Sequence, residues 1–283
     1  MKKLNRTVIT MVSLLIAIIV LLPFVLVVLN SAKSSAEIVT SPVAFPSDFS
    51  QLFTNFSSVI KNQNFNYWTS FLTSFLVTSI SLVLLIIFSS MAAWVLCRNK
   101  TKWSSIIFLG FIAAMTIPFQ VVMLPMLSSY RAIQDFTGIK FLQSIGGLVF
   151  AYLGFGGSMS IFVLHGFVKG IPLELEEAAA IDGCSKEGTF FRIIFPLLRP
   201  VHVTLLILNG IWIWNDYLLP SLMLGLSGNI KTLPVAVTSF VGSFVKQWDL
   251  ILSAAFLAMI PIIILFIFAQ KQIIKGMVEG AIK

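Results

Sequence analysis

Long apolar stretches alternate with short polar segments along most of the chain. A helix needs about 20 apolar residues to span the hydrocarbon core of a bilayer. The pattern predicts an all-α membrane protein with six transmembrane helices, at residues 8–29, 68–96, 104–127, 144–168, 201–224 and 251–269. Six spans place both termini on the same side of the membrane, and we expect the whole chain, 1–283, to form one transmembrane domain.

Two polar segments between the spans are longer than the rest. Residues 31–66 are rich in Ser and Asn, and we expect an ordered external loop or a short amphipathic piece. Residues 169–200 hold five of the eleven acidic residues of the chain. Within the spans, Pro118 predicts a kink, and the small residues Gly147 and Ala151, four apart, predict close packing against another helix.

The composition excludes a soluble globular domain. Hydrophobic residues make up 58% of the chain, the mean hydropathy is +0.98, and charged residues reach only 11%, against about 25% in soluble domains. The net charge of +8 comes from basic residues scattered between apolar segments. That distribution argues against a nucleic-acid partner and for a membrane-lipid environment.

The positions of Lys and Arg give the orientation. With the N-terminus inside, the cytoplasmic segments hold thirteen of them and the external segments six. By the positive-inside rule this excess predicts cytoplasmic N- and C-termini. The same orientation places the acidic segment 169–200 in the cytoplasm.

The acidic segment is expected to form two short helices joined by a turn. Glu174, Glu176 and Glu177 lie where the positive end of a helix dipole favours anions. Gly183 can end that helix because glycine adopts left-handed backbone angles without steric cost. A second helix is expected to start at the N-cap Ser185 and to be stopped by prolines, of which Pro196 is the first.

This segment also resembles a known motif. Glu177-Ala178-Ala179, three residues, Gly183, nine residues and Ile193-Ile194-Phe195-Pro196 match six of the seven defined positions of the EAA motif of bacterial ABC importer permeases, with Phe195 in place of Leu. The resemblance implies the type I importer permease fold, with a cytoplasmic coupling-helix loop at 169–200 between spans 4 and 5. The residues it assigns to ATPase coupling are Glu177, Ala178, Ala179, Asp182, Gly183, Ser185 and Pro196.

The resemblance implies a transporter subunit rather than an enzyme. The chain has no glycine-rich loop ending in Gly-Lys-Ser or Gly-Lys-Thr, so ATP and Mg are expected on a separate ATPase. No cofactor or metal is expected on this chain, and His165 and His202 are interpreted as interfacial polar residues. The implied partners are a second homologous permease subunit, two ATPase subunits and an extracytoplasmic sugar-binding protein. The resemblance implies that the protein is located in the bacterial cytoplasmic membrane.

The predicted fifth span contains the most polar intramembrane cluster. Ile213-Trp214-Asn215-Asp216-Tyr217 resembles the Trp-Asn-Asp segment of carbohydrate-type (MalG-like) permeases, as does Ser31-Ala32-Lys33-Ser34. The functional interpretation places the translocation pathway or its gate at Gln120, Asn209, Trp212, Asn215 and Asp216. The alternative is that Asp216 is an interfacial residue that caps or pairs locally. Because Trp212 and Trp214 are two residues apart, they cannot both face the pathway.

Two other functions stay open. The cargo of an ABC permease could be a non-sugar solute such as a polyol or glycerol phosphate. A stand-alone secondary transporter is less favoured, because ion coupling needs ionisable residues near the bilayer midplane and the only acidic residue inside a predicted span is Asp216.

Overall fold

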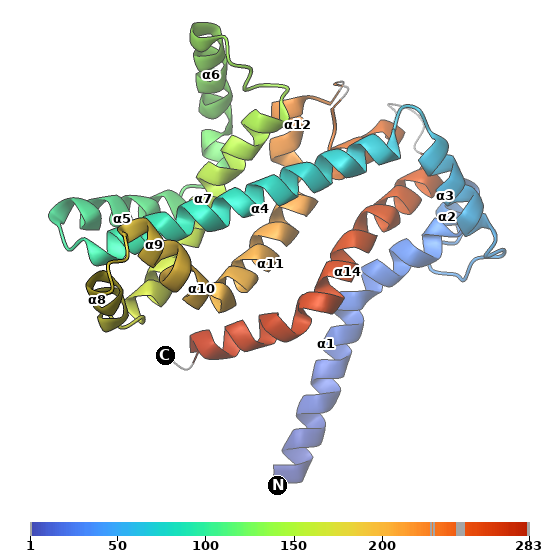
Figure 1. Cartoon of the computed structure of the whole chain (residues 1–283). Helices are drawn as coiled ribbons and strands as arrows, with labels where there is room; N and C mark the ends of the chain where they lie inside the picture. Colours follow the sequence, from blue (N-terminus) through green and yellow to red (C-terminus); the bar gives the residue numbers. More distant parts are fainter. Residues whose placement is uncertain (1, 227, 229, 242–246, 282–283) are drawn as a thin grey trace. The chain divides into compact units, whose positions relative to one another are not determined.

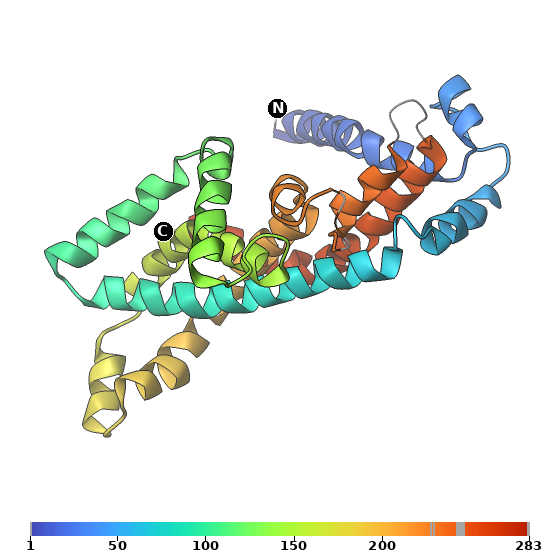
Figure 2. The same ribbon diagram turned by 90° about the horizontal axis from the view of Figure 1, so that it is seen from above.

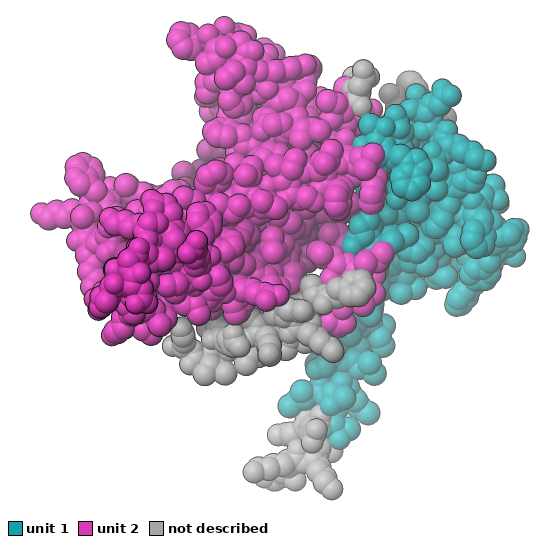
Figure 3. Space-filling model, in the orientation of Figure 1, with its two compact units in different colours: residues 1–70, 233–261 teal, residues 71–232, 262–283 magenta. Residues whose placement is uncertain are grey.

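A computed structural model describes residues 2–226, 228, 230–241 and 247–281, and these residues form helices and loops without a β-strand. The chain divides into two compact units, residues 1–70 with 233–261 and residues 71–232 with 262–283 (Figure 3). Each unit is described by itself. Four helices are long and apolar enough to cross a membrane, and there are up to six candidate spans if each of two bent helix pairs is one span.

The first unit begins with one long apolar helix, which matches the first predicted span. Helix α1 runs from Lys2 to Ser31 and exposes its apolar side chains along most of its length (Figure 1). Such a surface is compatible with lipid or with another membrane helix. The other helical elements of this unit are α2 (Ser35–Thr40), α3 (Gln51–Lys61), α13 (Leu233–Val237), the short 3₁₀ turn η2 (Thr238–Phe240) and the first part of α14 (Trp248–Ala281).

A buried lysine ties the end of α1 to the loop that follows it. The ammonium group of Lys33 donates to Asn30 Oδ1 at 2.9 Å and to the carbonyl of Ser41 at 2.8 Å. The side chain of Asn55 on α3 donates to the carbonyls of Ser31 and Lys33, both at 2.9 Å. Buried polar groups are costly unless they are hydrogen-bonded. These bonds join α3 to the start of the segment 31–66, which contains the two helices α2 and α3.

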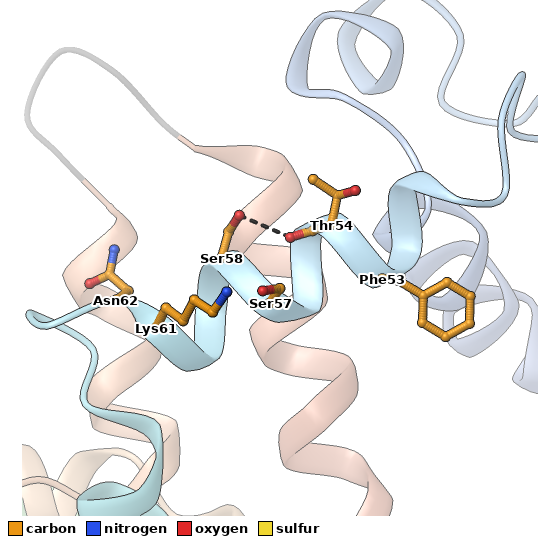
Figure 4. Close-up of a pocket in the computed structure, with 6 residues that line it drawn as sticks. All are labelled: Phe53, Thr54, Ser57, Ser58, Lys61 and Asn62. Atoms are coloured by element: carbon orange, nitrogen blue, oxygen red, sulfur yellow. Dashed lines mark hydrogen bonds between the residues drawn. The ribbon is translucent and has the colours of Figure 1, made fainter.

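Helix α3 is amphipathic. Its inner face buries Asn55 and Val59. Its outer face borders an open groove of about 710 Å³, lined by Phe53, Thr54, Ser57, Ser58, Lys61 and Asn62 (Figure 4). The hydroxyl of Ser58 donates to the carbonyl of Thr54 at 2.9 Å, so part of the polar lining is already satisfied within the helix.

The second unit packs around helix α7 (Ile145–Lys169), which corresponds to the fourth predicted span. Nearly half of its residues are buried, against α4 (Tyr67–Arg98) and α11 (Arg199–Asn215) among others. One apolar cluster includes Ile86, Leu164 and Leu205, and a second includes Leu85, Tyr152 and Ile213. These clusters hold the membrane-spanning helices of the unit together.

The predicted third span is two helices rather than one. Helix α5 (Lys102–Met115) and helix α6 (Phe119–Thr137) diverge by 110° at the break that contains Pro118 (Figure 1). The kink expected at Pro118 is therefore present, and it is sharp. Proline causes it because it cannot continue the hydrogen-bond ladder of α5.

The predicted fifth span is also interrupted. Helix α11 ends at Asn215, and α12 (Leu218–Leu224) begins after a break at Asp216 and Tyr217.

Gly147 on α7 permits a close approach to the loop before its own helix. A β-carbon there would lie 1.8 Å from the carbonyl oxygen of Phe141. The close neighbour of Gly147 is therefore a backbone segment. Ala151, the second member of the pair, is 2% exposed in the apolar cluster with Leu85 of α4 and Ile213 of α11, so helix packing is present at that position.

Candidate functional site

The segment 169–200 forms the two short helices and the turn that its sequence predicts. Helix α8 (Glu174–Ile181) carries Glu174, Glu176 and Glu177 in its first turn. Gly183 has φ of +77°, the left-handed angle for which glycine is suited. The hydroxyl of Ser185 accepts a hydrogen bond from the amide of Gly188 at 3.1 Å and caps α9 (Lys186–Thr189). Figure 2 shows these helices to one side of α4, near its C-terminal end.

The second helical stretch runs one residue past Pro196 and ends at Leu197, before Pro200. A bend of 72° there leads into α11, so the two prolines bound the end of this stretch as expected. The chain continues from α9 through the π-helical turn η1 (Phe190–Ile194) into α10 (Phe195–Leu197). The amide of Phe195 donates to the carbonyl of Phe190, five residues earlier, which is the wider spacing of a π-turn. Pro196 then lies in the first turn of α10, where a missing amide hydrogen costs little.

Helix α8 has two different faces. Glu177 and Ala178 are exposed, and Ile181 is 87% exposed although it is apolar. Asp182, Ser185 and Pro196 are exposed as well. Ala179 is only 6% exposed and turns into its own loop, so it does not share the outward surface of its neighbours in the motif. An exposed isoleucine beside a carboxylate gives α8 a small surface of mixed character.

The inner face of α8 is held to the end of α4 by Glu176. The guanidinium of Arg98 donates to Glu176 Oε1 at 2.7 Å, and the indole of Trp94 donates to Glu176 Oε2 at 3.0 Å. Arg98 also donates to the carbonyl of Ile171 at 2.9 Å. Arg98 and Glu176 form the one ion pair among residues that the structure describes. We call these contacts the Glu176 clamp.

The sequence analysis did not assign a role to the clamp residues. Trp94 and Arg98 are four residues apart and therefore lie on one face of α4. This spacing could have indicated from the sequence that both side chains contact the same neighbour. A cavity of about 330 Å³ lies beside the clamp, bordered also by Ala180 and Cys184. The Trp94 ring packs against Phe190 of η1, with centroids 5.4 Å apart. The end of α4 thus touches three parts of the loop.

Hydrogen bonds lower the pKa of the Glu187 carboxylate in this loop. The backbone amide of Glu187 itself and, second, the hydroxyl of Ser185 hold the pKa of Glu187 below its ordinary value of 4.5. Hydrogen bonds to a carboxylate stabilise its charged form. Glu187 is therefore a negative charge at the start of α9 at neutral pH.

The polar cluster of the predicted fifth span is arranged around Asp216. Its Oδ2 accepts from the hydroxyl of Tyr152 at 3.0 Å, and its Oδ1 accepts from the amide of Leu218 at 3.0 Å. The carboxylate therefore starts α12 and ties it to α7. Trp212 packs edge-on against Tyr152, with centroids 5.4 Å apart. The geometry matches the alternative in which Asp216 caps and pairs locally.

The other predicted pathway residues differ in exposure. Trp212 is 41% exposed and Trp214 is buried, so the two face different environments as expected. Asn215 is exposed, whereas Asn209 is buried and donates to the hydroxyl of Ser160 on α7 at 3.2 Å. Gln120, also predicted to line the pathway, is exposed at the start of α6. The structure brings Trp212 and Asp216 together through Tyr152, and Asn209 serves a separate helix contact.

The prediction that both histidines are interfacial is wrong for His202. His202 is buried on α11, and its Nε2 lies 2.8 Å from the hydroxyl of Ser90 on α4. His165 packs on Phe108 of α5, with ring centroids 3.9 Å apart. His202 therefore links two membrane helices, a role that depends on tertiary contacts.

Proteins of known function resemble the chain over nearly its whole length. It is 37% identical over 279 residues to a probable starch degradation products transport system permease of Thermoanaerobacterium thermosulfurigenes, covering 99% of this chain and 97% of that protein. It is 34% identical over 280 residues to the melibiose/raffinose/stachyose import permease of Bacillus subtilis, covering 99% and 97%. A multiple sugar-binding transport system permease of Streptococcus mutans is 31% identical over 269 residues, covering 94% and 93%.

The fold has a counterpart among solved structures. A chain of a bacterial ABC transporter involved in the import of the acidic polysaccharide alginate superposes with a TM-score of 0.79 at 20% identity, covering 95% of this chain and 96% of that chain. The family model described as "binding-protein-dependent transport system inner membrane component" matches residues 86–279, well over half of the chain. The chain therefore belongs to this family of multi-pass membrane components of transport systems, which are not enzymes.

Proposed function

We propose that this chain is one of the two membrane-spanning subunits of an ATP-driven importer for a sugar or oligosaccharide. Family membership supports the transporter role, and relatives named for starch degradation products and for melibiose, raffinose and stachyose support the cargo class. A sugar-binding protein outside the membrane delivers the cargo. Two ATPase subunits, which bind ATP and Mg, drive the change between outward and inward access.

The proposed topology has six spans. They are α1, α4, α7 and α14, the bent pair α5 and α6, and α11 with the short α12 after it. The second bent pair is the stretch 186–197 with α11, which meet at 72°. Both termini and the loop at 169–200 lie in the cytoplasm, and residues 31–66 lie outside. The thirteen-to-six division of basic residues supports this orientation.

The proposed interaction with the ATPase rests on the outward face of α8. Ile181 is 87% exposed beside the exposed Glu177 and Ala178. An exposed apolar side chain in a cytoplasmic loop is expected where a partner covers it. We therefore assign docking to this face, with Glu177 paired to a basic ATPase residue. Gly183 and Ser185 shape the turn behind it, where Asp182 also lies, and Ala179 and Pro196 support the loop from within their own helices.

The pathway assignment is narrower than the sequence suggested. Trp212, Asn215 and Gln120 are the exposed members of the predicted set, and an exposed indole offers the apolar face on which a sugar ring can stack. Asp216 shapes the start of α12, and Asn209 joins α11 to α7. We propose that the first three face the pathway, while Asp216 and Asn209 position the helices that form it.

The test is purification of the tagged chain, expressed with its neighbouring genes, in mild detergent, followed by mass spectrometry. We expect an ATPase and a second multi-span permease to co-purify. Glu177→Lys should reduce ATPase recovery at least about tenfold, because like charges facing each other across an interface cost several kcal/mol. Ile181→Glu should reduce it similarly by burying a charge.

The matched control is Glu187→Gln, which removes an exposed carboxylate from α9 in the same loop and should leave ATPase recovery unchanged. Uptake of maltotriose, melibiose and raffinose into proteoliposomes then tests the cargo class. ATP-independent transport by the chain alone would contradict the importer assignment. Uptake of a polyol but of none of the three sugars would contradict the cargo.

A further inference from the structure

We propose that the Glu176 clamp is the joint through which movement of α8 reaches the membrane helices, with Glu176 as a positioning residue distinct from the docking residue Glu177. This inference rests on the proposed function, because it assigns a transmission step within the ATPase-coupled cycle. The structure supports it in three ways, through the packing of α8, the geometry of the clamp and the onward contacts of α4.

Helix α8 has little apolar attachment to the rest of its unit. Ala179 is its only buried residue, and the exposed Ile181 contributes nothing to internal packing. At its C-terminal end the chain reverses at Gly183, where the backbone is left-handed. Because an alanine buries little area, polar contacts must determine where α8 lies relative to α4.

The clamp constrains α8 in more than one direction. Trp94 and Arg98 donate to different oxygens of the Glu176 carboxylate, which fixes the plane of the carboxylate and the rotation of α8 about its axis. Arg98 also holds the carbonyl of Ile171, on the segment that enters α8. Hydrogen bonds between charged groups are shorter and about twice as strong as neutral ones. A displacement of α8 therefore pulls on the end of α4.

The clamp is a joint rather than part of a sealed core. The side chains of Arg98 and Glu176 are 19% and 12% exposed, and the cavity of about 330 Å³ lies beside them. Space next to the contact lets α8 tilt without displacing packed side chains. The polar contacts can thus persist while the helix they hold changes its angle.

Helix α4 connects the clamp to the interior of the unit. It is one continuous helix from Tyr67 to Arg98. Ser90 lies one turn before Trp94 and is bonded to His202 of α11 at 2.8 Å. Leu85, further along, lies next to Gly156 of α7. A movement delivered at Glu176 therefore meets α11, which carries Asn209, Trp212 and Asn215, and α7, whose Tyr152 and Ser160 are hydrogen-bonded to Asp216 and Asn209.

The experiment compares sugar uptake per ATP hydrolysed in the complete complex, reconstituted with its partner permease, ATPase and binding protein. The probe is whichever of maltotriose, melibiose and raffinose the unaltered complex carries. Glu176→Gln keeps the size of the side chain and removes its charge. We expect ATPase recovery and basal hydrolysis to persist while uptake per ATP falls at least about fivefold, the lower end of typical coupling effects.

A double-mutant cycle tests whether the two charged residues act as one unit. Arg98→Gln should reduce uptake per ATP at least as much as Glu176→Gln, because it also removes the bond to the carbonyl of Ile171. The double variant should be no worse than Arg98→Gln alone, because both substitutions remove the same ion pair. Trp94→Phe keeps the ring against Phe190 and removes one hydrogen bond, so its loss should be smaller. Glu187→Gln is the charge-matched control and should keep the normal ratio.

The outcomes separate this inference from the proposed function. Normal uptake per ATP in Glu176→Gln would overturn the clamp as the joint. Additive losses in the double variant would also overturn it, because the residues would then act independently. Loss of ATPase recovery in Glu176→Gln would assign the residue to docking instead. Failure of the unaltered chain to recover an ATPase contradicts the proposed function itself.

Discussion

Helix α4 holds two neighbours by different means. Near its C-terminal end it holds α8 through the partly exposed Arg98 and Glu176, beside a cavity. One turn or more deeper it holds α11 through Ser90 and His202, which are 0% and 6% exposed and border an apolar cluster that includes Ile86 and Leu205. The contact of α4 with α8 is therefore partly exposed to water, whereas its contact with α11 is buried inside the packed unit.

The difference indicates which contact can change during a transport cycle. Protein interiors are close-packed, so a buried contact moves only when its neighbours move with it. A polar contact beside open space can change its angle at lower cost. Helix α8 is thus built to tilt against the end of α4, whereas Phe190 and Ile194, further along the same loop, are buried in one apolar cluster with α4, α7 and α11 and move with these helices.

Substitution at Gly147 should have the largest effect on stability, because it lies in the packed region. A β-carbon there would meet the carbonyl of Phe141 at 1.8 Å, and only backbone movement can relieve that overlap. Gly147→Ala should cost at least about 3 kcal/mol, the upper range for overpacking. Thermal denaturation of the detergent-solubilised complex, followed by loss of soluble protein, measures the effect.

The matched control is the preceding glycine. A β-carbon at Gly146 meets nothing within 4 Å, so Gly146→Ala should keep the denaturation midpoint of the unaltered protein. Equal midpoints for the two variants would mean that the loop at Phe141 moves freely, and the packed region would then not differ from the loop 169–200.

Substitutions at Gly183 should act through the backbone angle rather than through side-chain volume. A β-carbon at Gly183 has open space, but φ is +77°, which β-branched residues strongly disfavour. Gly183→Val should therefore cost about 1–2 kcal/mol locally. We expect reduced ATPase recovery and uptake with little change in the denaturation midpoint.

Asparagine separates the backbone effect from any effect of side-chain size. Gly183→Asn places a side chain of similar size at a backbone angle that Asn tolerates, so it should keep most of the uptake that Gly183→Val loses. Equal losses in both variants would show that side-chain bulk against the partner, rather than the turn, explains the defect.

Local features of the loop were predictable because they depend on neighbours in sequence. Gly183 ends a run of helix formers, and Ser185 precedes the start of α9, so the turn and the cap follow from backbone preferences alone. The motif around Glu177 identified the family in the same way. The span pattern likewise predicted the membrane class, because apolar length is a property of the sequence.

Contacts between distant residues were not predictable in this way. Glu176 and Arg98 are 78 positions apart, and Ser90 and His202 are 112 apart. The sequence indicates that each is polar but not which face of its helix meets which neighbour. The inward orientation of Ala179 is a similar case: the motif lists it beside Glu177 and Ala178, and only the fold shows that α8 turns it toward its own loop. The π-turn before Pro196 also escaped prediction.

The smallest effect should come from the N-cap of α9, which lies in the partly exposed loop and not in the packed region. Ser185→Ala removes the acceptor for the amide of Gly188 and one of the two hydrogen bonds that lower the pKa of Glu187. Amide exchange at residues 186–189 should become about fivefold faster, as for loss of an N-cap, while uptake stays normal. Hydrogen exchange with mass spectrometry measures this change.

The pH dependence of that exchange has a definite sign. Because the folded pKa of Glu187 is depressed, its stabilisation of α9 is complete above the ordinary value of 4.5 and is lost as the pH falls through the folded value. Exchange corrected for its intrinsic rate should thus be constant between about pH 6 and 8 and rise only in acid. A change near neutral pH would mean that another group controls the start of α9, and that the loop is coupled to titration elsewhere in the unit.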